Sequence, residues 1–585
     1  MAYRAPVRDL AFALTEAAGL ERLSAVMPGL DAEIVAAVLE AAGELAQGVL
    51  APINRTGDQQ GSRLENGKVV TPGGFAAAYK AFVEGGWNSL AADPAFGGQG
   101  LPKALELAVF EMVNGANMAF ALCPTLTLAA IEAIHAHGTE RQKALYLPKL
   151  ISGEWTGTMH LTEPQAGTDL GAVRSTAEQA PDGTWRLTGE KIFITWGAHD
   201  FTDNIVHMIL ARTKGAPEGV RGLSLFLAPQ RMVADDGTLG EGNTLGPASL
   251  EHKLGIHASP TCVMLYEAAR CELVGELNQG LAHMFTMMNA ARVAVGMQGV
   301  GVAEGAYQHA MAYARERRQG RSDWSADKPA AIVDHPDVRR MLALSKAKIE
   351  AARAICLSAG VAADLARLAG DEAERKAADL RAQLLTPIAK AWSTDVGVEV
   401  ASLGVQVHGG MGFIEETGAA QYYRDARIAP IYEGTNGIQG MDLVGRKLTM
   451  EAGQAVKDLI AEMSAIAADA KAGEGLAGVA ARLEAGIGAV STASEWLAAR
   501  QGPDALAGAA AYLKLFGDVL GGALLAKSAL AAQRRLASGD GDAAWLNGKT
   551  ALAQVFADQV LTGAPGLAEA AMAGAGAVKA VALET

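Results

Sequence analysis

The sequence predicts an α+β multidomain protein in which a helical region precedes a β domain and a helical bundle follows it. Three observations support this prediction. The chain has 585 residues, which is more than one typical core contains. Apolar residues recur at helical spacing on both sides of the middle region. From Trp155, short runs rich in β-branched and aromatic residues alternate with turn-forming pairs. We therefore divide the chain into residues 1–155, 156–279, 280–450 and 451–585.

The first region is predicted to be mostly helical. Asp31 is suited to cap a helix over residues 31–47, because Ile34, Val35, Val38 and Leu39 follow it at helical spacing. We expect further helices over 75–84, 104–114 and 123–136 and a short one that begins at Thr139, of which 123–136 is apolar nearly all round and therefore buried.

The second region is predicted to be a small antiparallel β domain over about residues 156–275. Pairs such as Asp182-Gly183 and Asp236-Gly237 favour turns between its strands. We expect strands over 184–188, 192–195, 204–212, 223–228 and 261–266.

Long helices return from Gly280. Residues 281–319 are compatible with a single helix of roughly ten turns. Helices over 335–368 and 372–404 follow, and Pro387 is expected to kink or interrupt the second. Long antiparallel helices predict a bundle. Beyond residue 450 the chain is Ala-rich and helical, with breaks at the glycine clusters of 473–478, 502–508 and 563–576.

Composition excludes several functional classes. The formal net charge is -14 with both signs interspersed, which argues against general nucleic-acid binding. Four cysteines are scattered without metal-ligand spacing, so we expect no metal site and buried thiols in a reducing compartment. Residues 1–10 lack the apolar core of a signal peptide, and we find no apolar run of about 20 residues that would predict a membrane span. We therefore expect a cytoplasmic protein.

The stretch 431–439 is the strongest candidate for chemistry. Glu433 is the only charged residue between Arg427 and Asp442, and it lies beside Tyr432 and Gly434. Glycines let a ligand approach the backbone closely. A lone carboxylate in such a place is suited to be a general base with a pKa raised by desolvation. The alternative is that Glu433 only marks the start of a helix.

Two stretches of the β domain are candidate ligand sites. Residues 159–171 offer hydroxyls and backbone amides to a polar ligand, or form an ordinary loop. Residues 191–197 place aromatics beside a threonine, which suits either an aromatic cofactor or a barrel core. There is no P-loop, and no GxGxxG fingerprint follows a strand. Glycines 296–301 lie within a helical pattern, which favours close helix packing.

Six motifs in order resemble the acyl-CoA dehydrogenase family over about residues 30 to 450. The resemblance implies a helical N-terminal domain, a central β-barrel domain and a C-terminal four-helix bundle, followed here by an extra helical domain. The motifs are Thr162-Glu163-Pro164 with Gly167-Thr168-Asp169, Phe193-Ile194-Thr195, Arg315-Glu316-Arg317-Arg318-Gln319, residues 406–412, Tyr423-Arg424-Asp425 and residues 431–439.

The resemblance implies non-covalent FAD held between two subunits, hence at least a homodimer. Positions that match the family's flavin contacts are Met159, Leu161, Thr162, Gly167, Thr168, Phe193, Thr195 and Thr435. Positions that match contacts from the second subunit to the pyrophosphate and adenosine are Arg317, Gln319, Gln406 and Gly410. A guanidinium suits a pyrophosphate by its planar fork and permanent charge.

Glu433 matches the catalytic base of most family members. It would remove the α-proton of an acyl-CoA thioester while the β-hydrogen leaves as hydride to flavin N5. The resemblance also implies that the flavin ribityl and the backbone N–H of Glu433 bond the thioester oxygen, and that an electron-transfer flavoprotein accepts the electrons. A minority of members place the base on the helix that contains Arg292, but residues 277–303 contain no Asp or Glu.

Five positions are assigned to the acyl-CoA substrate by the resemblance. Arg292 matches an arginine that holds the catalytic segment, with an exposed bundle arginine as the alternative. Asn289 and Ala291 occupy the neighbourhood of the alternative base. The expected substrate contacts are Thr168, Asn289, Arg292, Tyr432 and Gly434.

The sequence also departs from the family pattern. Gly440 stands where the family often has Arg, and Gly437 where it often has Gln. Gly320-Arg321 replaces a common Phe-Gly. This variant, the opening residues 3–7 and about 135 residues beyond the usual core resemble a bacterial subgroup that includes 3-methylmercaptopropionyl-CoA dehydrogenases of dimethylsulfoniopropionate breakdown. Three methionines, Met284, Met287 and Met288, are candidates either for a thioether-tolerant acyl pocket or, as we prefer, for bundle-core packing.

Alternatives to this function stay open. They are a short- or medium-chain fatty acyl-CoA dehydrogenase, an acyl-CoA oxidase that uses oxygen, and a catalytically silent acyl-CoA-binding scaffold. The retained Glu433 argues against the scaffold. Residues 451–585 are candidates to cover the bundle, form a dimer interface or touch a membrane, and the first two are preferred because their helices lack a basic face.

Overall fold

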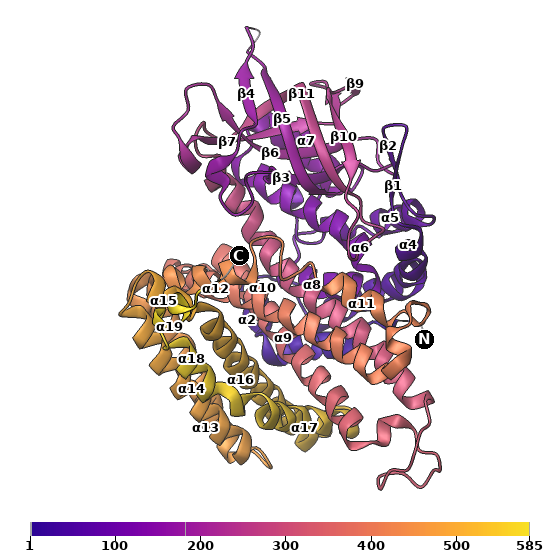
Figure 1. Cartoon of the computed structure of the whole chain (residues 1–585), viewed down its shortest axis with the longest axis vertical. Helices are drawn as coiled ribbons and strands as arrows, with labels where there is room; N and C mark the ends of the chain where they lie inside the picture. The colour runs from indigo at the N-terminus through magenta and orange to yellow at the C-terminus, as the bar shows by residue number, and fades with distance from the viewer. Residues whose placement is uncertain (1–2, 182, 584–585) are drawn as a thin grey trace.

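The computed structural model describes residues 3–181 and 183–583. The β domain occupies one end of the molecule, the long helices of the bundle run through its middle, and the C-terminal helices lie beside the bundle (Figure 1). The N-terminal helices pack behind the bundle and against the β domain. The order of domains therefore agrees with the α+β prediction.

The N-terminal region is built on four main helices. These are α3 (Ala32–Leu45), α5 (Phe75–Glu84), α6 (Lys103–His137) and α7 (Glu140–Ile151). The Asp31 side chain accepts from the Ile34 amide, so the predicted cap is confirmed. The helices expected over 104–114 and 123–136 are one element, α6, interrupted only by non-helical torsions at Asn117. Smaller elements are α1 (Val7–Phe12), α2 (Glu21–Ser24), α4 (Asn54–Gln60) and the hairpin of β1 (Arg63–Glu65) and β2 (Lys68–Val70).

The β domain contains a closed barrel. Hydrogen bonds join β11 (Thr261–Val274) to β5 (Trp185–Thr195), β5 to β4 (Thr176–Gln179), β4 to β6 (Ile205–Thr213), β6 to β7 (Leu223–Pro229), and β7 back to β11. Two strands extend this ring, β3 (Thr156–His160) beside β6 and β10 (Leu245–Leu250) beside β11. A separate hairpin is formed by β8 (Arg231–Val233) and β9 (Leu239–Gly242).

The expectation of a purely antiparallel domain was wrong. Strand β6 pairs in parallel with both β3 and β4. Residue alternation along a strand reports which face is buried, but it does not report the direction of the neighbouring strand. The strands expected over 184–188 and 192–195 form the single strand β5, whose register against β11 shifts twice. Its glycine, Gly189, has a φ of 150° and packs against Ser175.

The bundle consists of three long helices and one short one. They are α8 (Gly280–Glu316), α9 (Pro336–Leu368), α10 (Glu372–His408) and α11 (Ala419–Ala426). The expected interruption at Pro387 is absent, because α10 continues through it while packing against α8 and α9. Close packing explains the glycines of α8, since a Cβ at Gly296 would lie 2.5 Å from the Ala389 carbonyl oxygen.

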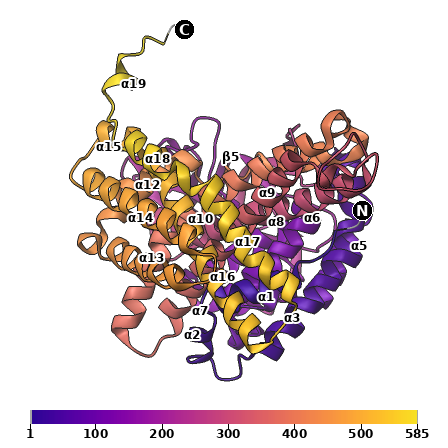
Figure 2. The same cartoon turned by 90° about the horizontal axis from the view of Figure 1, so that it is seen from below.

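The C-terminal domain covers one side of the bundle (Figures 1 and 2). Its longest helix, α16 (Ala509–Ser538), contacts α9, α10 and α12 (Asn436–Gly445). This placement supports the expectation that the segment covers the bundle. The other helices are α13 (Gln454–Ala472), α14 (Ala477–Ala498), α15 (Pro503–Ala507), α17 (Ala543–Gln559), α18 (Ala564–Ala571) and α19 (Gly576–Ala580). The helices are interrupted at each predicted glycine cluster, although the short helix α15 lies within 502–508 and α18 within 563–576, and a further break lies at residues 539–542.

Within the part of the chain that the structure describes, three helical stretches are long and apolar enough to cross a membrane by length and composition. Two of them, Lys103–His137 and Ala509–Ser538, are mostly buried inside the protein, with 83% and 89% of their most apolar windows covered. Their hydropathy is therefore explained by core packing. The third, Ala32–Gln60, is 39% buried over its window.

The Tyr423-Arg424-Asp425 motif joins three parts of the chain. The Arg424 guanidinium forms an ion pair with Asp58 of α4 at 2.6 Å and bonds the Leu254 carbonyl of the β domain. Asp425 accepts from the Ile256 amide in the same β-domain loop. The motif therefore fixes α11 of the bundle against both preceding domains.

Candidate functional site

Glu433 lies in the short segment between α11 and α12. Its backbone is left-handed, with a φ of 58°, and the next residue, Gly434, has a φ of 82°. Thr435 then caps α12, because its side chain accepts from the Ile438 amide at 3.3 Å. Glu433 thus precedes a helix start and also presents a partly buried carboxylate. A left-handed glutamate is uncommon, and such strain persists only where neighbouring groups hold it.

Side chains from α8 and α12 hold the backbone of this segment. Arg292 of α8 donates through Nε to the Glu433 carbonyl oxygen at 3.4 Å, and Gln439 donates to the Gly434 carbonyl at 3.1 Å. Arg292 is only 6% exposed, so it is not the exposed bundle arginine that was the alternative. The Tyr432 hydroxyl bonds Gln298 of α8. These contacts support the role expected of Arg292.

Asn436 ties the segment to one turn of α10. Its side-chain amide donates to the Ala391 carbonyl and to Thr394 Oγ1, both at 3.0 Å. It also donates to Asp395 at 2.8 Å. Its oxygen accepts from Lys390 Nζ at 2.9 Å. Contacts to four residues of α10 within 390–395 therefore fix Asn436, three positions after Glu433.

The surroundings of Glu433 suit a general base. Burial raises the pKa of Glu433 to about 7, against the opposing effect of the Arg292 and Lys390 cations. A base with a pKa near the working pH is largely deprotonated and still accepts a proton strongly. Lys390 is fully buried, and this burial lowers its pKa to about 8 despite the nearby Glu433 and Asp395.

The sequence analysis missed Lys390, and it gave Asn436 no role although this residue lies within the candidate stretch 431–439. One indication was available for the lysine, which is the only charge in the otherwise apolar run from Leu384 to Trp392. A lysine is almost never fully buried without a reason. Asn436 gave no comparable indication, because its partners lie 41 to 46 residues away in sequence.

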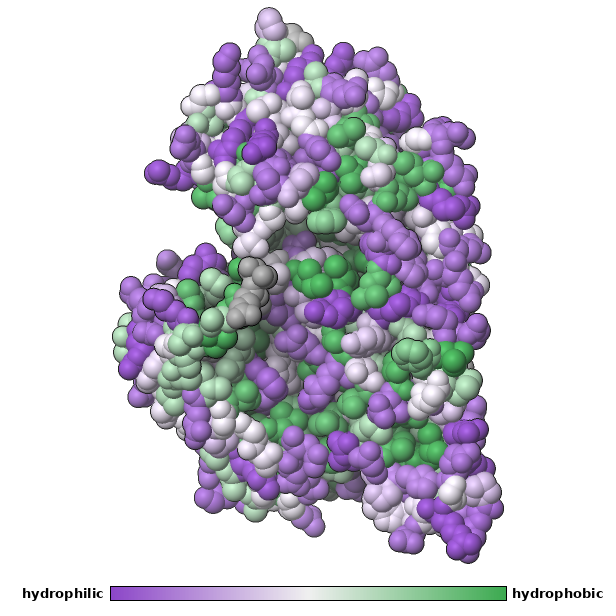
Figure 3. Space-filling model, viewed as in Figure 1, coloured by the Kyte–Doolittle hydropathy of each residue, from purple (hydrophilic) through white to green (hydrophobic). Residues whose placement is uncertain are grey.

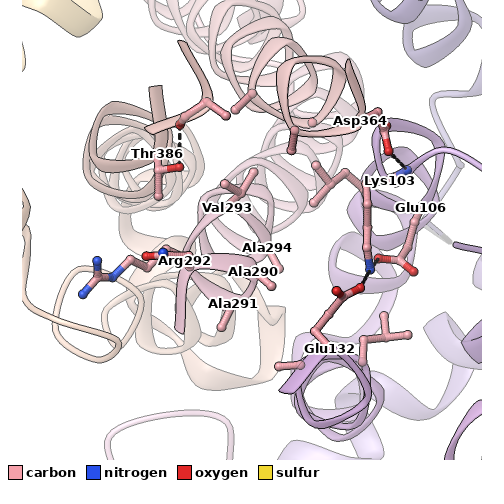
Figure 4. A pocket seen from close by; sticks show the side chains of 18 of the residues that line it. Lys103, Glu106, Glu132, Ala290, Ala291, Arg292, Val293, Ala294, Asp364 and Thr386 are labelled. Atoms are coloured by element: carbon pink, nitrogen blue, oxygen red, sulfur yellow. Dashed lines mark hydrogen bonds and ion pairs between the residues drawn. The ribbon is translucent and has the colours of Figure 1, made fainter. Parts of the chain in front are cut away.

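A cavity of about 310 Å³ lies around α8 beside this segment, between α6, α9 and α10 (Figure 4). Asn289, Ala291 and Arg292 line it, and the Arg292 side chain points away from the charged residues on the α6 side. There Lys103 bridges Glu106 at 3.1 Å and Glu132 at 2.7 Å. The expected substrate positions of α8 therefore border a cavity. The charged residues at its α6 side, Lys103, Glu106 and Glu132, form ion pairs with one another.

The methionines of α8 belong to the core. Met284 and Met287 are fully buried and Met288 is 9% exposed. They pack in a cluster with Met208 and Leu225 of the barrel. The structure therefore shows core packing for these methionines, but in the core between α8 and the β domain rather than in the bundle core that was preferred.

The flavin-assigned positions of the β domain lie on two adjoining segments. The Ile192 amide of β5 donates to the Thr162 carbonyl at 2.9 Å, which joins the loop after β3 to the strand that carries Phe193 and Thr195. Phe193 is 58% exposed with a φ of 60°. Thr168 is also exposed, and a Cβ at Gly167 would meet no atom within 4 Å. Met159 and Leu161 pack against the hydrophobic cluster that contains Met288 and Ala291 of α8. Met288 lies one helical turn before Arg292, and Ala291 directly precedes it.

A buried ion pair holds this loop. Lys191 Nζ lies 2.8 Å from Glu163 Oε1 and donates to the Leu161 carbonyl at 2.9 Å. The other ligands of the Glu163 carboxylate are the amides of Arg174 and Ser175 and the Gln165 side chain. Burial opposes the charge of Glu163, yet Lys191 and the amides hold its pKa at about 2. The sequence motifs contain both Lys191 and Glu163, but no role was predicted for either residue.

The second cofactor set lies at the far end of the bundle. Arg317 follows the last residue of α8, and Gln406 lies in the last turn of α10. Arg317, Gln319, Gln406 and Gly410 are all exposed. Tyr313 and His408 stack at 4.5 Å and join the two helix ends. Within residues 3–181 and 183–583, no hydrogen bond or ion pair joins this set to the β-domain set.

The residues present fit FAD. An exposed aromatic ring beside hydroxyls and open backbone amides suits the flavin ring system. The exposed guanidinium of Arg317 suits a pyrophosphate. Between the β domain and the C-terminal helices the surface is hollowed, with α12 and α15 at the lower rim (Figures 1 and 3). Among the described residues, no group of three or more His, Cys, Asp or Glu side chains is arranged to hold a metal ion.

Comparison with known proteins identifies the family of this chain. Family models for the N-terminal, middle and C-terminal domains of acyl-CoA dehydrogenases match residues 32–154, 158–269 and 278–449. A model named acetyl-CoA dehydrogenase C-terminal like matches residues 459–582. The four matches together span most of the chain.

Three individual proteins illustrate the similarity. The 3-methylmercaptopropionyl-CoA dehydrogenase of Ruegeria pomeroyi is 49% identical over 96% of both chains. A broad-specificity linear acyl-CoA dehydrogenase of Mycobacterium tuberculosis is 33% identical over 96% of this chain and 95% of its own. The structure of a Bacillus anthracis acyl-CoA dehydrogenase complexed with FAD shares the fold, with a TM-score of 0.75 at 22% identity over 93% of this chain and 89% of that one. The chain therefore belongs to the acyl-CoA dehydrogenase family and is an FAD-dependent oxidoreductase of acyl-CoA thioesters.

Proposed function

We propose that this acyl-CoA dehydrogenase oxidises 3-methylmercaptopropionyl-CoA, with Glu433 as the catalytic base. The observation that carries the choice of base is the partly buried Glu433 carboxylate, whose pKa is raised to about 7 and whose backbone is held by Arg292. The choice of thioester is supported by 49% identity over 96% of the chain to an enzyme named for that substrate.

The chain's own residues account for the proton-transfer half of the reaction. Glu433 accepts the α-proton, and its carboxylate becomes neutral as negative charge develops on the thioester oxygen. The backbone N–H of Glu433 is proposed to donate to that oxygen. Arg292 and Gln439 keep the segment in its left-handed conformation during this transfer. FAD, when bound, supplies the acceptor for the β-hydride at N5.

Substrate choice is tested by steady-state rates across a thioester series. The series runs from propionyl- to palmitoyl-CoA and includes 3-methylmercaptopropionyl-CoA. We expect the highest kcat/KM for 3-methylmercaptopropionyl-CoA, with butyryl-CoA next. A maximum at palmitoyl-CoA would contradict the proposed substrate while leaving the dehydrogenase activity intact. Turnover with oxygen alone at the same rate would identify an acyl-CoA oxidase instead.

The pH dependence of flavin reduction is the first specific prediction. Glu433 must be deprotonated to act, and its pKa of about 7 lies above the ordinary glutamate value. At low substrate the rate should therefore rise with pH, reach half its maximum near pH 7 and fall about tenfold per pH unit below that. Stopped-flow absorbance of the flavin measures this profile. A profile without a break between about pH 6 and about pH 8 would contradict the assignment.

We further propose a cytoplasmic homodimer that passes electrons to an electron-transfer flavoprotein. Exposed cofactor-assigned residues at the far end of the bundle, separate from the β-domain set, support a cofactor shared between two chains. Four free cysteines, all buried, suit a reducing compartment.

The variant Arg317→Met tests whether Arg317 binds FAD that is shared between two subunits. Loss of a charged hydrogen bond costs about 1.5 to 3 kcal/mol, so FAD affinity should fall by about 10- to 100-fold with the dimer retained. Equilibrium dialysis against FAD and gel filtration measure the two quantities. Arg318→Met is the matched control, because Arg318 already pairs with Asp327 at 2.8 Å. Equal FAD affinity in both variants would remove Arg317 from the cofactor site.

A further inference from the structure

The C-terminal domain contacts the part of α10 that also binds Asn436 of the Glu433 segment. Lys390, Ala391 and Thr394 bond Asn436, as described above. Trp392, which lies between them, instead donates its indole N–H to Asp518 of α16 at 2.8 Å. Trp392 is 3% exposed and Asp518 is 2% exposed. One turn of α10 therefore connects Asn436 with α16.

The Trp392 ring packs against two glycines of α16, Gly517 and Gly521. A Cβ at Gly517 would lie 2.3 Å from Trp392 Cδ1, and one at Gly521 would lie 3.3 Å from its far edge. Phe556 of α17 meets the ring edge-on at a centroid distance of 6.4 Å. Because a side chain at Gly517 would overlap the indole, the surface of α16 is shaped to receive this tryptophan.

A second contact joins α16 to α12, the helix that begins directly after Glu433. A Cβ at Gly440 of α12 would lie 3.0 Å from the Ala509 carbonyl oxygen in the first turn of α16. The related family pattern often has Arg at this position. The first turn of α16 leaves little room there even for a methyl group, so the glycine at position 440 allows α12 and α16 to approach closely.

We propose that the C-terminal domain positions Glu433. Helix α16 holds α10 through Trp392 and α12 through Gly440, and these two helices hold the Glu433 segment through Asn436 and Gln439. Gly440, Trp392 and Asp518 are positioning residues, because none of them is assigned to the substrate or FAD. The inference builds on the proposed role of Glu433 as base.

The test compares Gly440→Ala and Asp518→Leu, which removes the acceptor of the Trp392 indole N–H, with two matched controls in the FAD-loaded full chain. Gly445→Ala changes a glycine of the same helix that meets no atom within 4 Å. Tyr512→Phe removes a buried hydrogen bond of α16, to Ser494 at 2.6 Å, that lies within the C-terminal domain. Anaerobic flavin reduction by 3-methylmercaptopropionyl-CoA or butyryl-CoA is followed from about pH 5 to about pH 9.

We expect both test variants to reduce flavin about tenfold more slowly than wild type, because small displacements of a catalytic group cost large factors in rate. The midpoint of the acid limb should move to lower pH as Glu433 gains water, with FAD content and acyl-CoA affinity unchanged. The two control variants should keep the wild-type rate of flavin reduction and the wild-type pH midpoint of the acid limb. If the test variants lower only the thermal midpoint, as Tyr512→Phe would, the proposal is overturned. Failure of wild type to reduce flavin would instead count against the proposed function.

Discussion

Replacing Glu433 by Gln is expected to slow flavin reduction by about a thousandfold or more while FAD and acyl-CoA still bind. The amide is isosteric with the carboxylate, but it does not accept the α-proton. Arg292 and Gln439 bond the backbone of the segment rather than the Glu433 side chain, so the loop conformation should survive. Rapid-mixing absorbance under anaerobic conditions measures the rate.

Binding must be measured on the same Glu433→Gln preparation. The flavin spectrum should still change when acyl-CoA is added, because the ring of the ligand-bound flavin has a different environment even without electron transfer. Glu416→Gln serves as the matched control, since Glu416 is an exposed carboxylate of the same domain. Reduction of flavin by the Glu433 variant within about tenfold of wild type would move the base to another residue.

Replacing Lys191 by Met is expected to give the largest loss of stability among the predicted variants. Lys191 is fully buried and Glu163 is 3% exposed, so the substitution leaves a buried carboxylate without its cation. Breaking one side of a buried pair costs about 3 to 5 kcal/mol. The Leu161 carbonyl also loses its donor, so the loop that carries Thr162 and Thr168 should loosen and release FAD. Scanning calorimetry and FAD content per chain measure the two effects.

Two further variants separate the ion pair from a general surface effect. Arg270→Met breaks an exposed pair of the same domain, Arg270 with Glu241 at 3.1 Å, and should change stability by no more than about 1 kcal/mol. The double variant Lys191→Met with Glu163→Gln should be less destabilised than the two single changes added together, because it removes both buried charges. Additive effects would show that the pair does not act as a unit.

Local patterns predicted much of the fold. Helical periodicity located α5, α8 and α9, and Asp31 was recognised as a cap because its neighbours in sequence are its neighbours in space. The parallel pairing of β3 with β6 was not predicted, since β4 and β5 lie between these strands in sequence and residue alternation does not report strand direction. Pro387 was expected to kink or interrupt α10, whereas the helix continues through it, because packing along α8 and α9 offsets the cost of about 3 kcal/mol.

In the candidate site, too, residues close together in sequence were predicted, whereas contacts between distant parts of the chain were not. Glu433 and Gly434 were found because their chemistry is concentrated in nine consecutive residues, and Arg292 was assigned by family resemblance. Lys390 was missed because its contact with Asn436 joins positions 46 residues apart, and the pair of Lys191 with Glu163 spans 28. Such contacts are set by domain packing, which residue spacing alone does not report. The contact of Trp392 with Asp518 spans 126 residues and two domains.

Anaerobic addition of acyl-CoA to the FAD-loaded wild-type protein tests the central claim most directly. The account predicts that 3-methylmercaptopropionyl-CoA and butyryl-CoA bleach the flavin absorbance within the mixing experiment, with a rate that rises with pH through about 7. A protein that holds FAD but is bleached by neither thioester, at any pH between about 6 and about 9, would contradict it.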